Sequence, residues 1–105
     1  MEIIETPIFT RKIKDVLSDS EYGQLQWALV INPEAGLVIS GCGGLRKLRW
    51  AIPGKGKRGG LRVIYYWYRQ DEKIYMLLPY RKSERDDLTK QQMKMLIEHV
   101  KEGVV

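Results

Sequence analysis

Three basic side chains in the middle of the chain are spaced so that they could hold one anion. Lys47 and Arg49 are two residues apart, which places both on the same face of a β-strand. Arg62 begins a second segment that could pair beside that strand. Like charges facing each other across a sheet repel, and no Asp or Glu lies between Ala35 and Gln70 to separate them. We therefore expect an anion to complete the arrangement; the alternative is that all three side chains extend into water from a half-exposed sheet.

The loop Pro53–Gly60, between these two segments, alternates glycine with positive charge. Its four glycines allow the backbone to approach a ligand closely, at an entropic cost that a tighter hairpin turn would avoid. A nucleotide-binding P-loop is not supported, because Gly59 is followed by Gly60 and Leu61 instead of Lys and Ser or Thr. We interpret it as a phosphate-contacting loop, the alternative being an exposed hairpin loop, and its cations are Lys55, Lys57 and Arg58.

The positive charge of the chain is concentrated in its middle third. The formal net charge is +5, from 18 Lys and Arg against 13 Asp and Glu. Eight of the 18 lie between Ala35 and Gln70, which leaves 10 for the rest of the chain against all 13 acids. A field of one sign confined to one segment attracts a polyanion to one place. This pattern favours a nucleic-acid ligand over a merely solvated basic loop.

Length and composition exclude several other classes of protein. With 105 residues, 44% of them hydrophobic, the chain is expected to form a single domain over residues 1–105 with one modest core. The apolar run around Leu77–Pro79 is too short to span a bilayer and the acidic start is unlike a signal peptide, so we expect a cytoplasmic protein without membrane association. Cys42 is the only cysteine, which rules out an internal disulfide and a cysteine-built metal cage. We expect Cys42 to be buried and His99 to lie on a helix surface.

The elements that position these residues can be inferred from periodicity. A strand is expected over residues 1–6, followed by a helix from Ile8 to Leu17. Ser18 and Asp19 can cap a second helix, which Glu21 supports at its N-terminal end. That helix should stop at Asn32, because proline pushes the residue before it out of helical geometry.

The period then changes from about 3.6 to 2. Strands are expected over residues 45–52, 62–68 and 73–78, in an antiparallel meander whose centre is the tyrosine-rich strand. Thr89 and Gln92 form a capping box for a C-terminal helix that reaches Val104. The predicted fold class is α+β, with a small antiparallel twisted sheet, an N-terminal helical hairpin and a C-terminal helix.

Aromatic residues are dense in this sheet. Tyr65, Tyr66, Trp67 and Tyr68 follow one another, and Trp50 lies in the preceding strand. Such side chains can stack on nucleobases, but alternation should place about half of them in the core, so we assign most of them to packing. We expect Trp27, on the second helix, to be a core or helix contact.

Three segments of the sequence carry a resemblance to a known family: Gly43–Arg49, Gly54–Tyr66 and Tyr80–Glu84. Together they resemble the HigB branch of the RelE-superfamily toxins, and the order of elements agrees over nearly the whole chain. The resemblance implies the toxin of a type II toxin–antitoxin pair, an mRNA interferase that enters the ribosomal A site and cleaves translated messenger RNA. It also implies a cognate helix-turn-helix antitoxin, which neutralises the toxin and binds operator DNA as a complex with it.

The resemblance also implies an endoribonuclease site at Lys47, Arg49, Arg62 and Lys82. Because this basic centre has no carboxylate cluster to hold Mg²⁺, we expect no metal and no cofactor. Attack by a ribose 2′-hydroxyl on the adjacent phosphate needs a base, stabilisation of the phosphoryl oxygens and a proton for the leaving oxygen. Lys47 can be the base if Arg49 and Arg62 disfavour its charged form. The two arginines suit the phosphoryl oxygens, and Lys82 can hold the phosphate or protonate the leaving group.

Further RNA contacts are expected around this centre, from Arg46, Lys55, Lys57, Arg58, Tyr80 and Arg81. The sequence departs from parts of the wider superfamily at two positions. Ser83 and Thr89 stand where some members carry an arginine and a tyrosine, and Tyr80 is the candidate substitute.

Two other functions use the same basic patch. The protein could be a non-catalytic RNA- or ribosome-binding module, in which case it would bind messenger RNA and leave it intact. It could also be a regulatory subunit whose basic face docks an acidic antitoxin segment, with salt-sensitive partner binding and no affinity for RNA.

Overall fold

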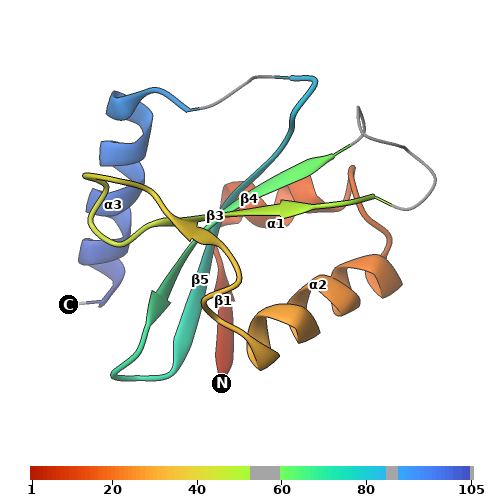
Figure 1. Ribbon diagram of the computed structural model, residues 1–105, viewed down its shortest axis with the longest axis horizontal. Helices are drawn as coiled ribbons and strands as arrows, with labels where there is room; N and C mark the ends of the chain where they lie inside the picture. The colour runs from red at the N-terminus through yellow and green to blue at the C-terminus, as the bar shows by residue number, and fades with distance from the viewer. Residues whose placement is uncertain (53–59, 85–87, 105) are drawn as a thin grey trace.

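Five strands form one sheet in the order β1-β5-β4-β3-β2. The computed structural model describes residues 1–52, 60–84 and 88–104 (Figure 1). The elements in chain order are β1 (Glu2–Glu5), α1 (Pro7–Ile13), α2 (Asp19–Ile31), β2 (Leu37–Val38), β3 (Arg46–Trp50), β4 (Leu61–Tyr68), β5 (Lys73–Arg81) and α3 (Lys90–Val104).

The predicted antiparallel meander is confirmed, with β4 at the centre of the sheet. Two features of the sheet edges were not predicted. At one edge β1 pairs with β5 in parallel, so the sheet is mostly and not wholly antiparallel. At the other edge the two-residue strand β2 pairs with β3, inside a glycine-rich stretch that is too short to show a strand period.

The helices cover the two faces of this sheet, as Figure 1 shows. On one side α1 and α2 pack against a core that includes Phe9, Leu25, Leu29, Val63 and Tyr65. On the other side α3 packs against a second core that includes Ile64, Leu77, Leu78, Met93 and Val100. The fold class predicted from the sequence is therefore confirmed, with the sheet as the central layer.

The cap predicted at Ser18 and the capping box predicted at Thr89 are both present, and the Ser18 cap is also a full capping box with Glu21. The Ser18 hydroxyl accepts from the Glu21 N–H at 3.1 Å, and the Glu21 carboxylate accepts from the Ser18 N–H at 2.8 Å. At the start of α3, Thr89 and Gln92 make the same reciprocal pair at 3.1 and 2.9 Å. Because these bonds satisfy N–H groups that have no partner within the helix, they fix where α2 and α3 begin.

Trp27 corrects one expectation. Its side chain is 65% exposed and is not part of the core. Helix α2 buries Leu25 and Leu29, which are four residues apart and share a face, so a residue two positions after Leu25 points to the opposite side. Cys42 is buried and His99 is exposed, as predicted.

Tyr65, in the central strand β4, holds the turn at residues 33–36 by hydrogen bonds. Its hydroxyl donates to the Pro33 carbonyl at 2.7 Å and accepts from the Gly36 N–H at 2.9 Å. Glycine is required at position 36, because a Cβ there would lie 2.7 Å from Cε1 of the Tyr65 ring. This contact sets the path of the chain from the end of α2 into β2.

Tyr65→Phe is expected to destabilise the protein by about 1–3 kcal/mol, because it leaves the Gly36 N–H and the Pro33 carbonyl without a buried partner. Burial also raises the pKa of Tyr65 above its ordinary value of 10.0. The folded state therefore holds this proton more tightly than the unfolded state, and the associated stability is lost as the pH rises above about 10. Denaturant unfolding at pH 7 and pH 10.5 measures this effect. Between the two pH values, the free energy of unfolding should fall less for Tyr65→Phe than for the unmodified protein.

The matched control is Tyr68→Phe, since the Tyr68 hydroxyl donates only to the exposed Gln70 side chain. Its unfolding free energy should change by less than about 0.5 kcal/mol. Equal stability of Tyr65→Phe and Tyr68→Phe would show that the buried hydrogen bonds of Tyr65 do not hold the 33–36 turn.

Candidate nucleic-acid interface

Strand register brings the central cations together. In the β3–β4 pair Arg49 lies directly opposite Arg62, and Lys47 lies opposite Ile64. Since alternate residues of a strand share a face, Lys47, Arg49 and Arg62 project from the same side of the sheet. We call these three residues the cation cluster. Ile64 belongs to the core beneath α3, so the cluster lies on the α3 side of the sheet.

A bulge in β5 places the C-terminal part of that strand on the same face as the cation cluster. Ile64 pairs with Leu78 but Tyr65 pairs with Met76, so Leu77 is an extra residue in β5. Such a bulge shifts the alternation by one. Met76 therefore packs on the α1 and α2 side, whereas Leu78 packs on the α3 side.

Because of this bulge, the side chain next to Arg62 on β5 is that of Tyr80. Tyr80, two residues after Leu78, lies opposite Arg62 on the face of the cation cluster. One residue beyond β5, the Lys82 N–H donates to the Gly60 carbonyl at 3.0 Å, which holds the exposed Lys82 beside the start of β4. Lys82 is thus at the same end of the sheet as Arg62 and Arg49.

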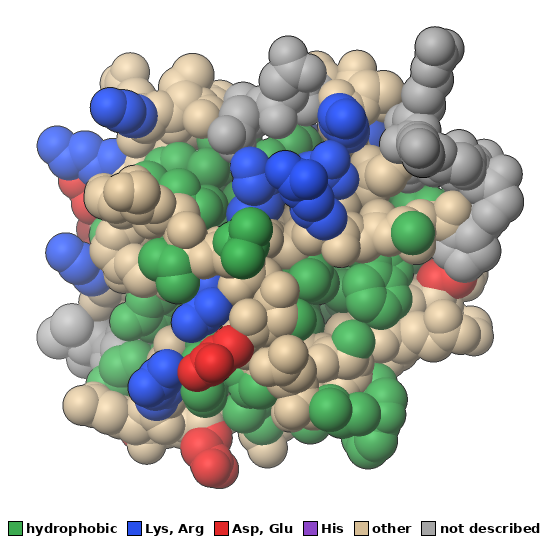
Figure 2. Space-filling model, viewed as in Figure 1, with side chains coloured by type: hydrophobic (Ala, Val, Ile, Leu, Met, Phe, Trp, Pro, Cys, Tyr) green, Lys and Arg blue, Asp and Glu red, His purple; other side chains and the backbone are tan. Residues whose placement is uncertain are grey.

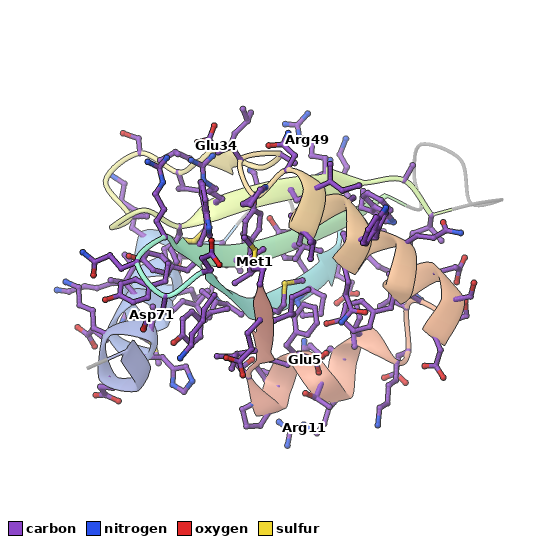
Figure 3. All side chains as sticks on the ribbon, turned by 90° about the horizontal axis from the view of Figure 1, so that it is seen from below. Met1, Glu5, Arg11, Glu34, Arg49 and Asp71 are labelled. Atoms are coloured by element: carbon purple, nitrogen blue, oxygen red, sulfur yellow. The ribbon has the colours of Figure 1, made fainter. Side chains whose placement is uncertain are left out.

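Within the described residues, no acidic side chain pairs with Arg49, Arg62 or Lys82 at this end of the sheet. Among the described residues, the salt bridges join Arg69 to Glu34 at 2.9 Å and Lys73 to Glu2 at 4.0 Å, and neither involves Arg49, Arg62 or Lys82. Figure 2 shows Lys and Arg side chains gathered over the middle of the sheet with no Asp or Glu side chain among them. Figure 3 shows the labelled Arg49 extending outward from the sheet.

Among the described residues, the side chain of Arg62 makes one weak hydrogen bond. Its Nη1 makes a 3.4 Å hydrogen bond to the carbonyl of the adjacent Leu61, and its side chain is half-buried. Directly opposite like charges destabilise a sheet. The Arg49–Arg62 pair therefore costs stability unless an anion lies between the two guanidinium groups, which can each bind phosphate oxygens through two parallel N–H donors.

Arg46 and Arg81, both predicted to contact RNA, lie on the other face of the sheet. Arg46 donates to the Gly36 carbonyl at 2.8 Å, and Arg81 donates to the Asp15 carbonyl at 3.1 Å. Both guanidinium groups thus satisfy backbone carbonyls in the segments after α1 and α2. The structure does not bring them together with the cation cluster, and an RNA contact by either residue stays a prediction.

Tyr80 shares the cluster's face but is only 1% exposed. It packs in the core beneath α3, together with Leu88 and Met93. A base could stack on its ring only after this packing opened. The loop cations Lys55, Lys57 and Arg58 lie outside the described residues.

Three lysines of α3 were not recognised as candidates from the sequence. Lys90, Lys94 and Lys101 border a hollow between α3 and the loop that precedes β3. Their spacings of four and seven residues place them on one helix face, which is a signal present in the sequence. Nothing in the sequence indicated that this face would lie beside residues 40–43.

In the described parts of the chain, no three His, Cys, Asp or Glu side chains come close enough to hold a metal ion together. None of the helices in those parts is long and apolar enough to cross a membrane.

Fold and site together define a small α+β protein with a basic face on its sheet. A family model described as the RelE toxin of the RelE / RelB toxin–antitoxin system matches residues 1–103, and the chain belongs to this family. Among solved structures, it is similar to a double arginine-to-alanine mutant of the E. coli toxin RelE in the free state, with a TM-score of 0.57 and 14% sequence identity. The alignment covers 81% of this chain and 86% of that chain. The RelE-superfamily assignment made from the motifs is confirmed; the HigB branch stays a prediction.

Proposed function

We propose that this RelE-family toxin is a ribosome-dependent endoribonuclease that cleaves translated messenger RNA in the ribosomal A site. The observation that carries the proposal is the cation cluster, in which Arg49 and Arg62 face each other across β3 and β4 and neither pairs with an acid of the described residues. A scissile phosphate with its developing negative charge is the ligand that such a pair fits best.

The proposed reaction uses the RNA's own 2′-hydroxyl as nucleophile. Lys47 takes the proton of this hydroxyl as its oxygen bonds to the adjacent phosphorus. Arg49 and Arg62 bind the non-bridging oxygens, on which charge accumulates. Lys82 supplies a proton to the 5′-oxygen as the bond from phosphorus to that oxygen breaks. The products are a 2′,3′-cyclic phosphate and a free 5′-hydroxyl, and no water is consumed in this step.

The arrangement of the elements supports these roles. Lys47 and Arg49 come from β3, Arg62 from β4 and Lys82 from the end of β5, so three neighbouring strands supply the four groups. Groups held on a rigid sheet lose little freedom when the substrate binds. The face is exposed at Arg49 and Lys82, which suits a large substrate presented by the ribosome more than a small molecule held in a closed cavity.

The same proposal includes the partners. The toxin pairs with a cognate antitoxin, as the family description states for its members. We further propose that this antitoxin has a helix-turn-helix fold and that operator DNA is bound only by the toxin–antitoxin complex. In this proposal the basic face of the toxin binds messenger and ribosomal RNA, and not operator DNA.

A message with one 2′-deoxynucleotide at the cleaved position tests the mechanism. Purified toxin is added to ribosomes halted on this message and on its all-ribose equivalent. We expect the ribose message to be cleaved, leaving a 2′,3′-cyclic phosphate end. The deoxy message should be cleaved at least about 100-fold more slowly, because it lacks the hydroxyl that acts as nucleophile.

Each alternative function has its own outcome in this assay. Ribosome binding with both messages intact would show the non-catalytic binding module. Cleavage of the deoxy message at the normal rate would refute 2′-hydroxyl attack while leaving a nuclease in place. Absence of both ribosome binding and cleavage would favour the antitoxin-docking subunit.

A further inference from the structure

A second basic surface lies beside the cation cluster, between α3 and the loop of residues 40–43. The two elements enclose an open groove of about 620 Å³, which Ser40, Gly41 and Gly43 line from one side. Lys94 and Lys101 line it from the other side and are both exposed. In Figure 2, Lys and Arg side chains also lie over α3, at the left of the view that shows the central basic patch.

The groove wall is held in place by backbone contacts. The Ile39 N–H donates to the Leu45 carbonyl at 2.8 Å, and the Leu45 N–H donates to the Cys42 carbonyl at 3.1 Å, which closes the loop on itself. Gly43 has a φ of 61° and approaches α3 so closely that a Cβ would lie 3.2 Å from Cγ2 of Ile97. Because the loop is tied both to itself and to α3, the groove exists before any ligand binds.

The charge of the groove is positive but not uniform. Glu98 also lines it, against the three lysines at positions 90, 94 and 101. In the described part of the chain no salt bridge joins Glu98 to any of these lysines. The lysine charges are therefore available to a ligand, and Glu98 opposes the binding of an anion.

The groove continues the face that carries the cation cluster. Gly43 lies shortly before β3, so Lys47 is only four positions further along the chain, at most about 13 Å of extended backbone. Helix α3 covers the same side of the sheet from which the cluster projects. A chain molecule bound at the cluster can therefore pass directly into the groove.

We propose that this groove binds the phosphate backbone of RNA that extends beyond the scissile phosphate. The inference rests on the proposed function for the nature of its ligand. Lysine ammonium groups are strongly hydrated point charges that suit successive phosphates without reading the bases. The groove thus contributes affinity and orientation for the ribosome–message complex, while the cation cluster performs the chemistry.

Removal of two groove lysines tests the proposal. The variant Lys94→Gln/Lys101→Gln is compared with Arg11→Gln/Lys14→Gln, which removes the same charge from exposed positions in the last turn and at the C-cap of α1. Binding to purified ribosomes is measured by anisotropy of a labelled toxin over a range of KCl concentrations. For the groove variant we expect weaker binding and a slope of log K against log[KCl] that is smaller by about 2, one for each lost phosphate contact. The control pair should change neither.

Glu98→Gln is the second variant, and it is expected to bind ribosomes several-fold more tightly, which a folding defect could not produce. Two messages separate the sources of the RNA: one ends at the A-site codon and the other extends beyond it. A defect of the lysine variant confined to the longer message supports binding of the message beyond the scissile phosphate. An equal defect with both messages would overturn that assignment and show that the groove contacts ribosomal RNA instead.

Cleavage kinetics separate this inference from the function on which it rests. The lysine variant should need more ribosomes for half-maximal cleavage, at an unchanged maximal rate. If the unmodified toxin cleaves no message, the proposed function fails, yet ribosome binding still reports on the groove. If the lysine variant binds and cleaves like the control pair, or loses only its affinity for the antitoxin, the groove is not an RNA site.

Discussion

Arg62→Ala is expected to lower the maximal rate of message cleavage by about 100- to 1,000-fold, the usual effect of removing one preorganised group that stabilises charge in the transition state. The protein should stay folded, because within the described part of the chain the Arg62 guanidinium makes a single long hydrogen bond, to its neighbour's carbonyl. We expect its unfolding free energy to change by no more than about 0.5 kcal/mol. Single-turnover cleavage on saturating programmed ribosomes and denaturant unfolding measure the two quantities.

Arg69→Ala is the matched control for this experiment. Arg69 follows the opposite end of β4, where it pairs with Glu34 at 2.9 Å and lies 4.6 Å from the centre of the Trp67 ring. Its loss should leave the cleavage rate unchanged. Arg62→Lys should recover part of the activity, since it keeps the charge but not the paired donors. Full activity of a folded Arg62→Ala variant would remove Arg62 from the proposed mechanism.

Arg49→Glu is expected to abolish cleavage while stabilising the fold. The substitution places a carboxylate directly opposite Arg62, so a repulsive cross-strand pair becomes an attractive one. Such a change is worth about 0.5–1 kcal/mol. The same carboxylate repels the phosphate and occupies the Arg62 guanidinium, so cleavage should fall at least as far as in Arg62→Ala. Thermal or denaturant unfolding and the ribosome cleavage assay are the measurements.

Arg49→Gln separates the two contributions, because it removes the repulsion without adding an attraction and should have an intermediate stability. The stability gain of Arg49→Glu should largely disappear in 1 M salt, where the Debye length is about 3 Å. An active Arg49→Glu variant would refute the phosphate-binding role of the pair. An inactive variant that is less stable than Arg49→Gln would show that position 49 serves the fold.

These two predictions express one physical trade-off. A sheet optimised only for stability would place an acid opposite Arg62. In the proposed function, keeping two arginines there lowers the stability of the free toxin and prepares a site for an anion, as is common where binding or catalytic groups are held ready. The antitoxin-free protein should therefore gain stability from polyanions that reach this face.

Local structure could be predicted from the sequence because its causes lie within a few residues. The capping boxes at Ser18 and Thr89 and the end of α2 at Asn32 depend on side chains next to the backbone groups that they affect. The tyrosine-rich strand is recognisable by its composition, and its central place in the sheet follows from short connections on both sides.

The site could be predicted only in part. Placing Lys47 and Arg49 on one face needs only the two-residue period of a strand. The same period also separates Arg46 from them, but the sequence did not show that Arg46 and Arg81 would bind backbone carbonyls on the far face. The burial of Tyr80 and the exposure of Trp27 likewise depend on which faces α3 and α2 turn toward the sheet.

By itself, then, the sequence determined the helices and strands other than β2, the concentration of positive charge between residues 35 and 70, and the family motifs. Tertiary structure alone decided that Arg49 faces Arg62, that the extra residue Leu77 turns the end of β5 toward the cation cluster, and that the α3 lysines border the loop before β3. The reason is that strand register and helix docking depend on contacts between residues far apart in the chain, and a shift of one residue in a strand exchanges its two faces.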